Sequence, residues 1–379
     1  HHPFAAAPSR ESESRVIGAS GPANVPVLYP TSQSYLDPAA YTLAEALHDA
    51  GYRTGHFGKW HLGLTEPHWP ERQGFDVAFH CHPDPGPPGG YFSPYGVSPP
   101  GAEKPAKPAR QQRVGTITDG PPGEYITDRL TDEAIRFVEE SVAASKDRPF
   151  FLNLWHYGVH GPWGHKESLT AEMAKRTDPN GRQDNPVMAS MLKSVDESLG
   201  RLLDTLDRLG IADDTLVIFT SDNGPWLSYG DHAGSAGMLR EGKGTAFEGG
   251  HRVPCVARLP GRIPSGTVCD EPLMTIDVLP TVAALTGRPL PTDPDGFCTV
   301  EGRRIDGHDR WNLFRGEKPA AAPTYLFWYG DNELQAVREG RWKLFLPHTA
   351  RALEDREPGS GGTPSGYKPL KVGRELYDL

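Results

Sequence analysis

The sequence predicts an α/β fold with a small antiparallel β subdomain near the C-terminus. Amphipathic helical segments alternate with short apolar runs between residues 42 and 224, which is the order expected for a sheet whose faces are covered by helices. After about residue 310 the pattern changes to short β-rich runs. We therefore assign residues 1–310 to an α/β domain and residues 311–379 to an antiparallel subdomain that is truncated at its end.

Three segments have the apolar periodicity of helices. Apolar residues recur at helical spacing in residues 42–52, which end near Gly51, and again in residues 125–142. The clearest amphipathic helix covers residues 187–210, and Gly210 provides the expected end.

Short apolar runs supply the predicted strands of the α/β domain. Residues 149–155 and 215–224 are predicted to be buried strands, and residues 53–60 a short extended segment. The stretch 82–123 is rich in proline and glycine, so we expect a long surface excursion that contributes nothing to the core.

The C-terminal part is predicted to form a small antiparallel sheet. Residues 324–330, 334–338 and 341–346 have the composition of strands, and Glu339–Gly340 is predicted to be the two-residue hairpin loop between the last two. The final residues 375–379 resemble a further strand.

The bulk composition excludes several classes of protein. The 39 Lys and Arg against 49 Asp and Glu give a formal net charge of −10, whereas nucleic-acid-binding proteins usually carry a basic excess. The four cysteines include no C-x-x-C pair, so a zinc knuckle and a thioredoxin-type motif are excluded. No apolar run is long enough to span a membrane, and the first residues lack the apolar core of a signal peptide.

Two histidines and a lysine lie at glycine-marked positions where α/β proteins place their active sites. Lys59 and His61 flank Trp60 in the stretch GHFGKWHLG. His160 precedes Gly-Pro in HYGVHGPW, whose glycines exclude the helix that a zinc-protease motif requires. His160 is therefore a loop histidine, which either faces a pocket or has no role.

Asp222 and Asn223 directly follow an apolar run and offer oxygen ligands that suit Ca²⁺ or Mg²⁺. The same residues are also typical of an ordinary Asx turn. Lys243 lies in a glycine-rich stretch that resembles a phosphate-binding P-loop, but Gly244 stands where Ser or Thr is required and no strand and helix flank the loop. We therefore expect a glycine-rich loop that presents a cation and no nucleotide site.

Together these residues indicate a site for a tetrahedral oxyanion. Lys59, His61, His160 and Lys243 are four potential cations, and Asp222 is a candidate metal ligand. Such a set could stabilise negative charge on non-bridging oxygens and supply a proton to a leaving oxygen. Residue types alone leave phosphate and sulfate esters as alternative substrates.

Several motifs resemble those of one family, in sequence and in order. These are GYRTGHFGKWHLG, FLNLWHYGVHGPW, SDNGPW, GKGTAFEGGHRVPCVARLPGRI and IDVLPTVAALTG. They are similar to segments of the type I sulfatases, in the arylsulfatase A-like branch of the alkaline phosphatase superfamily. The resemblance covers the chain from about residue 25 to its end. It implies an alkaline-phosphatase-like central mixed sheet flanked by helices, hydrolysis of an aryl or carbohydrate sulfate ester, and a periplasmic or secreted location.

The resemblance also implies a role for each cationic residue. Lys59 and Lys243 would bind the sulfate oxygens of an anionic substrate. His61 would hold the sulfated nucleophile, and His160 would contact the substrate and protonate the leaving alcohol.

The N-terminus departs from the family pattern. The family nucleophile is a formylglycine made from the first residue of Cys-x-Pro-Ser-Arg, but here Ala6 occupies that place while Arg10 matches the motif. The family's Asp-Asp pair is also missing, so Asp222 and Asn223 are the two ligands that we can name for Ca²⁺, with Mg²⁺ as the alternative. We expect a truncated or damaged copy that binds metal weakly and turns over little.

The N-terminus is also consistent with deliberate removal of the nucleophile and with a natural pseudoenzyme. Two alternative functions follow from the same residues. One is a phosphodiesterase or phosphonate monoester hydrolase of the same superfamily, and the other is a non-catalytic module that binds sulfated glycans.

Overall fold

The structure is a computed structural model. It describes residues 16–17, 32–33, 35–63, 65–82, 87–98, 114–145, 147–179, 185–227, 234–318, 324–329, 333–353 and 366–379.

The helices are α1 (Leu43–Asp49), α2 (Ile126–Ala144), α3 (Glu167–Met173), α4 (Pro186–Leu209), α5 (Glu248–His251), α6 (Val278–Leu285) and α7 (Trp311–Phe314). Short 3₁₀ turns cover Glu66–His68, Pro70–Arg72, Ala212–Asp214 and Thr275–Asp277. The strands of the α/β part are β1 (Val16–Ile17), β2 (Ser32–Gln33), β3 (Arg53–Lys59), β4 (Val77–His82), β5 (Val114–Gly115), β6 (Phe150–Trp155), β7 (Val217–Thr220), β8 (Cys255–Arg258), β9 (Thr299–Val300) and β10 (Arg303–Arg304). The C-terminal strands are β11 (Thr324–Tyr329), β12 (Glu333–Glu339), β13 (Trp342–Phe345), β14 (His348–Ala352), β15 (Lys368–Val372) and β16 (Glu375–Asp378).

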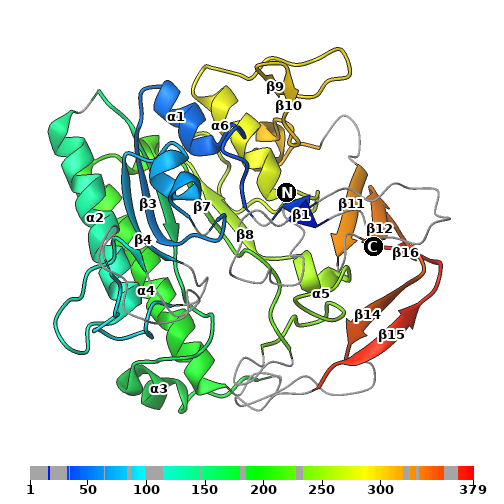
Figure 1. The fold of residues 1–379 in the computed structure, drawn as a ribbon, viewed down its shortest axis with the longest axis horizontal. Helices are drawn as coiled ribbons and strands as arrows, with labels where there is room; N and C mark the ends of the chain where they lie inside the picture. Colours follow the sequence, from blue (N-terminus) through cyan, green and yellow to red (C-terminus); the bar gives the residue numbers. More distant parts are fainter. Residues whose placement is uncertain are drawn as a thin grey trace.

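The main sheet is mixed and has the strand order β5-β4-β3-β6. β3 runs parallel to both β4 and β6, whereas β5 pairs with β4 in the antiparallel direction. β7 and β8 form a separate antiparallel ladder. Figure 1 shows this ladder between the main sheet and the C-terminal strands. The predicted mixed α/β architecture is thus present, and its interior strand β3 is the one that carries Lys59.

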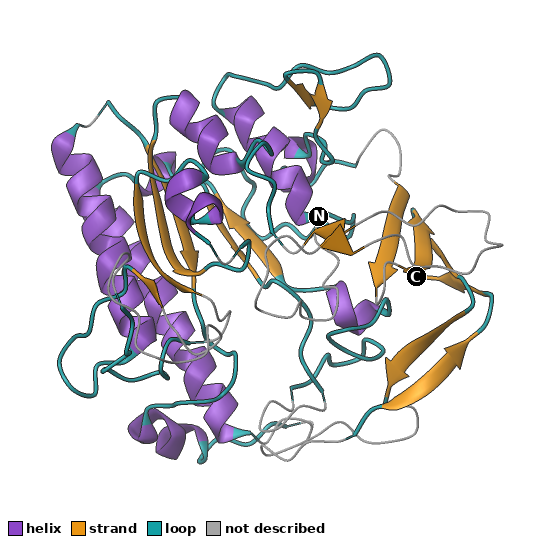
Figure 2. Cartoon of the chain, in the orientation of Figure 1, coloured by secondary structure: helices purple, strands orange, loops and turns teal. Residues whose placement is uncertain are grey.

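Alternate residues of β3 face two different layers, as the pleat of a strand requires. Phe57 packs against Phe137 of α2, with ring centroids 5.6 Å apart. His56, on the opposite face, lies 5.0 Å from the Trp60 ring and 5.4 Å from the Phe75 ring. Helix α4 packs along α2 on the first face, as Figure 2 shows.

The predicted helices are confirmed, because local signals define their ends. Thr42 caps α1 in a capping box: its hydroxyl accepts from the Glu45 backbone N–H at 3.1 Å, and the Glu45 carboxylate accepts from the Thr42 N–H at 2.7 Å. Gly210 closes α4 with φ +68°, the left-handed conformation that glycine adopts readily.

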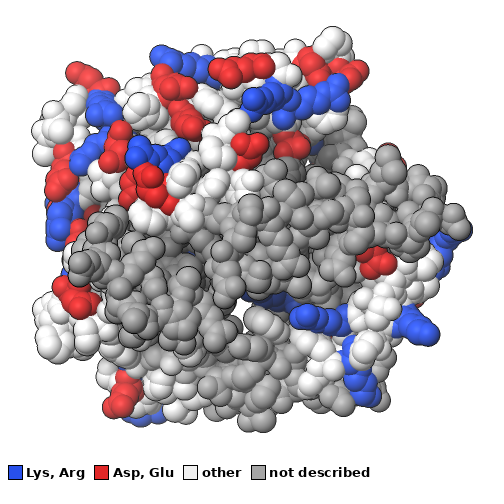
Figure 3. Space-filling model, in the orientation of Figure 1, with Lys and Arg blue, Asp and Glu red and all other residues white. Residues whose placement is uncertain are grey.

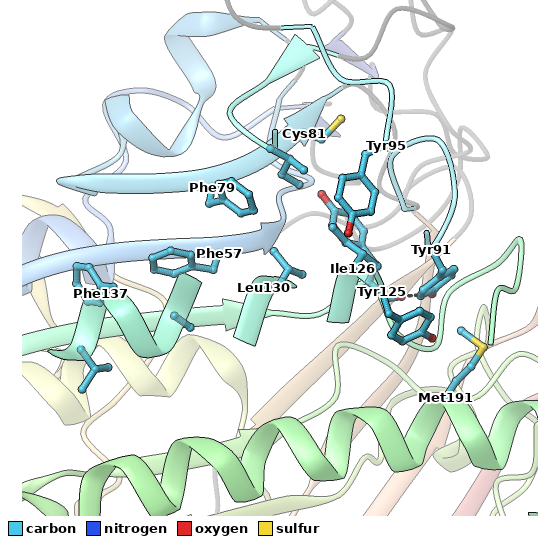
Figure 4. Close-up of a cluster of buried hydrophobic side chains, with 14 of the residues drawn as sticks. Phe57, Phe79, Cys81, Tyr91, Tyr95, Tyr125, Ile126, Leu130, Phe137 and Met191 are labelled. Carbon is cyan, nitrogen blue, oxygen red and sulfur yellow. Dashed lines mark hydrogen bonds between the residues drawn. The ribbon is translucent and has the colours of Figure 1, made fainter. Parts of the chain in front are cut away.

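The prediction that residues 82–123 lie outside the core is wrong for part of that stretch. Tyr91, Tyr95 and Ile117 are at most 2% exposed and belong to the largest core cluster, drawn in Figure 4. They were missed because the high proline and glycine content of the stretch predicts surface loops. The tyrosines can be buried because their hydroxyls are satisfied: Tyr91 donates to the Tyr157 carbonyl at 2.8 Å and Tyr95 to the Glu124 carbonyl at 3.0 Å.

The two apolar strands are shorter or less buried than predicted. Trp155 at the end of β6 is 44% exposed, and Phe219 in β7 is 40% exposed. Among the described strands β6 pairs with β3 alone and β7 with β8 alone, so each lies at an edge. An apolar run predicts a strand but does not reveal what covers it.

The C-terminal strands form an antiparallel sheet of order β11-β12-β13-β16, so the predicted β-rich subdomain and its ELYDL strand are confirmed. The predicted hairpin loop is wrong by one residue. Glu339 pairs with Trp342, which leaves Gly340–Arg341 as the two-residue loop, with Gly340 at φ +54°. The division at residue 310 stays a prediction.

The described surface mixes charges of both signs. In Figure 3 acidic and basic side chains alternate over the helical end of the molecule, without a broad basic patch on that visible part. None of the described helices combines the length and apolarity needed to cross a membrane.

Candidate active site

The carboxyl ends of β3 and β7 bring a lysine and a carboxylate together. Lys59 is the last residue of β3 and is 8% exposed. Its Nζ donates to Asp222 Oδ2 at 2.9 Å, and Asp222 follows β7 after Ser221. Because β7 is not paired with the main sheet among the described strands, this ion pair is a tertiary contact that no strand register imposes.

Close backbone packing brings the Lys243 loop to the same place. The Gly224 N–H donates to the Gly250 carbonyl at 3.0 Å, and the Lys243 N–H donates to the Pro225 carbonyl at 2.8 Å. A Cβ added to Gly224 would lie 1.8 Å from the Gly249 carbonyl oxygen. Only glycine therefore allows the two loops to approach this closely.

Lys243 lies within electrostatic range of the Lys59–Asp222 pair. Its Nζ is 5.3 Å from the centre of the Trp226 ring. Desolvation lowers the pKa of Lys243; Asp222 opposes this shift and Lys59 adds to it. β3 and the Lys243 loop thus hold two ammonium groups near one carboxylate, an arrangement with an excess of positive charge.

His160 is oriented by its own loop and by a buried tyrosine. The Tyr91 hydroxyl donates to the His160 carbonyl at 2.6 Å, and His160 Nδ1 lies 2.7 Å from the Gly161 carbonyl oxygen. A carbonyl is only an acceptor, so Nδ1 carries a proton and Nε2 is the nitrogen that exchanges one. Desolvation lowers the pKa of His160, and the charges of Lys59 and Lys243 lower it further.

His61 lies just beyond the end of β3, two residues after Lys59. Desolvation by the surrounding protein, then the charges of Lys59, Lys243 and His160, lower its pKa to about 4. His61 is therefore neutral at physiological pH, as two nearby ammonium groups require.

Asp222 is ionised and Asn223 offers a second oxygen. Partial desolvation acts to raise the pKa of Asp222, but the Lys59 charge and hydrogen bond outweigh it and the net pKa is lowered. The Asn223 amide donates to the Gly224 carbonyl at 3.0 Å. Its Oδ1 is buried and accepts no hydrogen bond from any described residue.

The Asp222 carboxylate and the Asn223 amide oxygen are the kind of ligand that a hard cation prefers, but they are too few to complete its coordination. A buried amide oxygen without a donor beside an ionised carboxylate is a suitable pair of ligands for Ca²⁺, which takes about six to eight oxygens. Within the described ranges no group of three or more His, Cys, Asp or Glu could hold a metal ion. Asp222 and Asn223 could therefore supply only two of the oxygen ligands that such an ion needs.

Comparison with known proteins decides the family. The Sulfatase family profile matches residues 13–288. The chain belongs to the sulfatase family. Steryl-sulfatase of Mus musculus is 34% identical to this sulfatase-family chain over 388 residues, which cover 84% of the chain and 58% of the relative. Arylsulfatase A of Homo sapiens is 33% identical over 370 residues, covering 93% and 67%.

A solved structure agrees with this assignment. The crystal structure of Ps i-CgsB in complex with k-i-k-neocarrahexaose superposes with a TM-score of 0.66 at 27% identity, covering 82% of this chain and 66% of that one. The predicted resemblance and the alkaline-phosphatase-like fold are confirmed. The chain spans 58% of the length of this steryl-sulfatase.

Some residues of the candidate site were not predicted, and two predicted residues lie outside the described ranges. Trp226, whose ring lies near the Lys243 Nζ, could have been found from the sequence, because it directly follows SDNGP. Tyr91, which bonds the His160 carbonyl, was missed because it lies in the stretch that was predicted to be on the surface. The predicted nucleophile position Ala6 and the predicted site residue Arg10 lie outside the described residues.

Proposed function

We propose that the protein binds a sulfate ester at this site and descends from enzymes that hydrolyse such esters to an alcohol and inorganic sulfate. The observation that carries the proposal is the convergence of Lys59, Lys243 and Asp222 with two histidines of lowered pKa. Two ammonium groups in a partly desolvated site favour an anion, and their positions on a strand end and on a separate loop suit an anion with several oxygens.

In this proposal Lys59 and Lys243 bind sulfate oxygens. The ion pair with Asp222 holds the Lys59 Nζ in place before the anion arrives. Trp226 lies beside the Lys243 Nζ and keeps part of its surroundings apolar, which strengthens attraction to an anion.

The two histidines would handle protons on either side of the bound anion. His160, with a proton held on Nδ1 by the Gly161 carbonyl, would give a proton from Nε2 to the leaving alcohol. A bound anion would raise the pKa of His160 by offsetting the two lysine charges, so the proton donor would form when the substrate binds. His61 would stay neutral and hold the nucleophile side of the site.

Asp222 and Asn223 are the residues that would hold the cation. Ca²⁺, or Mg²⁺ as the alternative, would supply positive charge that stabilises anionic oxygens.

We propose that turnover by this chain is impaired, because Ala6 has no side-chain atom that could become a nucleophile. The substrate class that we propose is an aryl or carbohydrate sulfate, in keeping with the names of the arylsulfatase and steryl-sulfatase relatives and with the oligosaccharide in the Ps i-CgsB structure. For the same reason of kinship we propose a periplasmic or secreted location.

The test is sulfate binding by isothermal titration calorimetry, with Lys59→Met and Lys243→Met as variants and Lys175→Met, an exposed lysine, as the matched control. We expect each site variant to weaken sulfate binding by about tenfold or more and the control to change nothing. Equal affinity in all four proteins would refute the proposal.

Turnover is measured separately on an aryl sulfate and an aryl phosphodiester, with Ca²⁺ present. The variant Ala6→Cys restores Cys-x-Pro-Ser-Arg and tests whether the nucleophile alone limits the reaction. Faster hydrolysis of the diester would favour a phosphodiesterase, and sulfate binding without turnover in any variant would favour a sulfated-glycan-binding module.

A further inference from the structure

The loop that carries Lys243 is anchored to the C-terminal sheet through a buried lysine. Lys343 lies on β13 and is 1% exposed. Its Nζ donates to the Ala246 carbonyl at 2.5 Å, to Glu248 Oε1 at 2.8 Å and to His251 Nε2 at 2.9 Å. All three partners lie in residues 246–251, which directly follow the Lys243 loop and include α5. Figure 1 shows α5 beside the C-terminal strands.

The surroundings of Lys343 leave the ammonium group no access to water, so these partners replace its hydration. Its Nζ lies 4.2 Å from the Phe327 ring centre and 5.2 Å from the Phe345 ring centre. Glu248 balances the charge and also lies 3.5 Å from the Arg338 guanidinium. A buried ammonium group is tolerated when it is paired and fully hydrogen-bonded, as it is here.

His251 takes part as a neutral acceptor. Desolvation, then the Lys343 charge, lower the pKa of His251 to about 4. Its ring lies 4.6 Å from the Phe327 ring, so β11 also contacts α5. The three donor bonds of Lys343 therefore fix the Ala246 backbone and two side chains of α5 to β13. The His251 ring contact adds β11.

A second contact secures the other side of the Lys243 loop. Glu241 adopts φ +57°, a left-handed conformation that costs a non-glycine residue energy. Its Oε2 accepts the Leu353 backbone N–H at 2.8 Å. Lys243 thus lies between two anchors that both belong to the C-terminal part, Leu353 on one side and Lys343 on the other.

We propose that Lys343 is a positioning residue for anion binding: it holds residues 241–248 against the C-terminal sheet, so that the Lys243 Nζ is presented to the anion beside Lys59. The proposal rests on the proposed function of Lys243 as a sulfate ligand. It gives the C-terminal sheet a direct part in the site, although none of the predicted site residues comes from that sheet.

The experiment separates the anchoring of the loop from the binding of sulfate. Lys343→Met removes the donors. The double variant Lys343→Met/Glu248→Gln also removes the buried negative charge that loses its closest partner, while an amide oxygen at this position can still accept from Arg338. Lys371→Met, an exposed lysine on β15, is the matched control. Hydrogen exchange of peptides covering residues 241–248 reports the loop, and calorimetry with inorganic sulfate reports the site.

We expect exchange in residues 241–248 to rise by about tenfold or more in both Lys343 variants, and sulfate affinity to fall by about tenfold. In a Lys243→Met background, the Lys343 substitution should have no further effect on sulfate affinity, because the lysine that it positions is gone. The Lys371 variant should change neither measurement.

Unchanged exchange in a folded double variant would overturn the proposal. So would an equal loss of sulfate affinity with and without Lys243, because that result would show a general effect on the fold. If the unmodified protein binds no sulfate, the proposed function is wrong, and the exchange measurement alone then judges whether Lys343 anchors the loop.

Discussion

Gly58 is a position where one added methyl group should strongly disturb the site. It lies on β3 directly before Lys59, with φ +106°. Its parallel partner on β6 is Trp155. A Cβ built on Gly58 would lie 2.0 Å from the Trp155 carbonyl oxygen. Gly58→Ala therefore combines an unfavourable backbone conformation with a backbone clash at the centre of the main sheet.

The size of the effect follows from these two contributions. The positive φ alone costs an L-residue about 1–2 kcal/mol. The clash cannot be relieved by a side-chain rotation, because the obstructing atom is a backbone oxygen, so β3 and β6 must separate by more than an ångström. We expect a total loss of about 3–5 kcal/mol, a large part of the roughly 5–15 kcal/mol that stabilises a typical domain.

Urea unfolding measures the loss, with Gly51→Ala as the control. Gly51 has a comparable φ of +91° but nothing within 4 Å of a built Cβ, so its substitution should cost only the conformational part, about 1–2 kcal/mol. Equal losses in the two variants would refute the clash argument. In Gly58→Ala protein that still folds, sulfate affinity should also fall, because the displaced strand carries Lys59.

Three further predictions concern other parts of the molecule. Thr42→Ala should lower stability by about 1 kcal/mol through loss of the α1 cap, seen as a lower urea midpoint; an unchanged midpoint would show that the cap contributes nothing. Burial lowers the pKa of His156 to about 4, so the protein takes up a proton there on unfolding. Stability should be full above pH 6.5 and fall by about 2 kcal/mol at pH 5 from this group. His156→Gln, which keeps a partner for the Ser198 hydroxyl, should show a shallower pH dependence, and an identical slope would exclude His156 as the source. Calcium should bind with a dissociation constant of about millimolar order, since two oxygens complete little of its coordination sphere. Calorimetry that shows tight calcium binding, unchanged by Asn223→Ala, would contradict the assignment of Asn223 as a ligand.

Helix positions could be predicted because their signals are local. The Thr42 capping box and Gly210 act within one turn of the helices that they bound. That Lys59, Lys243 and Asp222 lie near one another could also be predicted, since each stands at a turn beside a predicted strand or in a glycine-rich loop. The reaction that they serve stays a prediction. Strand coverage could not be predicted, as the exposed Trp155 and Phe219 show, because burial depends on elements distant in the chain.

The sequence by itself determined the family, the helices and the residue types that would meet an anion. Only the tertiary structure decided how they meet. Lys59 and Asp222 are 163 residues apart in the sequence, yet they meet at 2.9 Å. The Lys243 loop reaches the same place because the backbones of Gly224 and Gly249 approach closer than any side chain would allow. Likewise, nothing in the sequence distinguishes Lys343 from other residues of its β-rich segment. Only the tertiary structure shows that its charge is buried against α5. Contacts of this kind are set by packing between distant segments, and no local pattern encodes them.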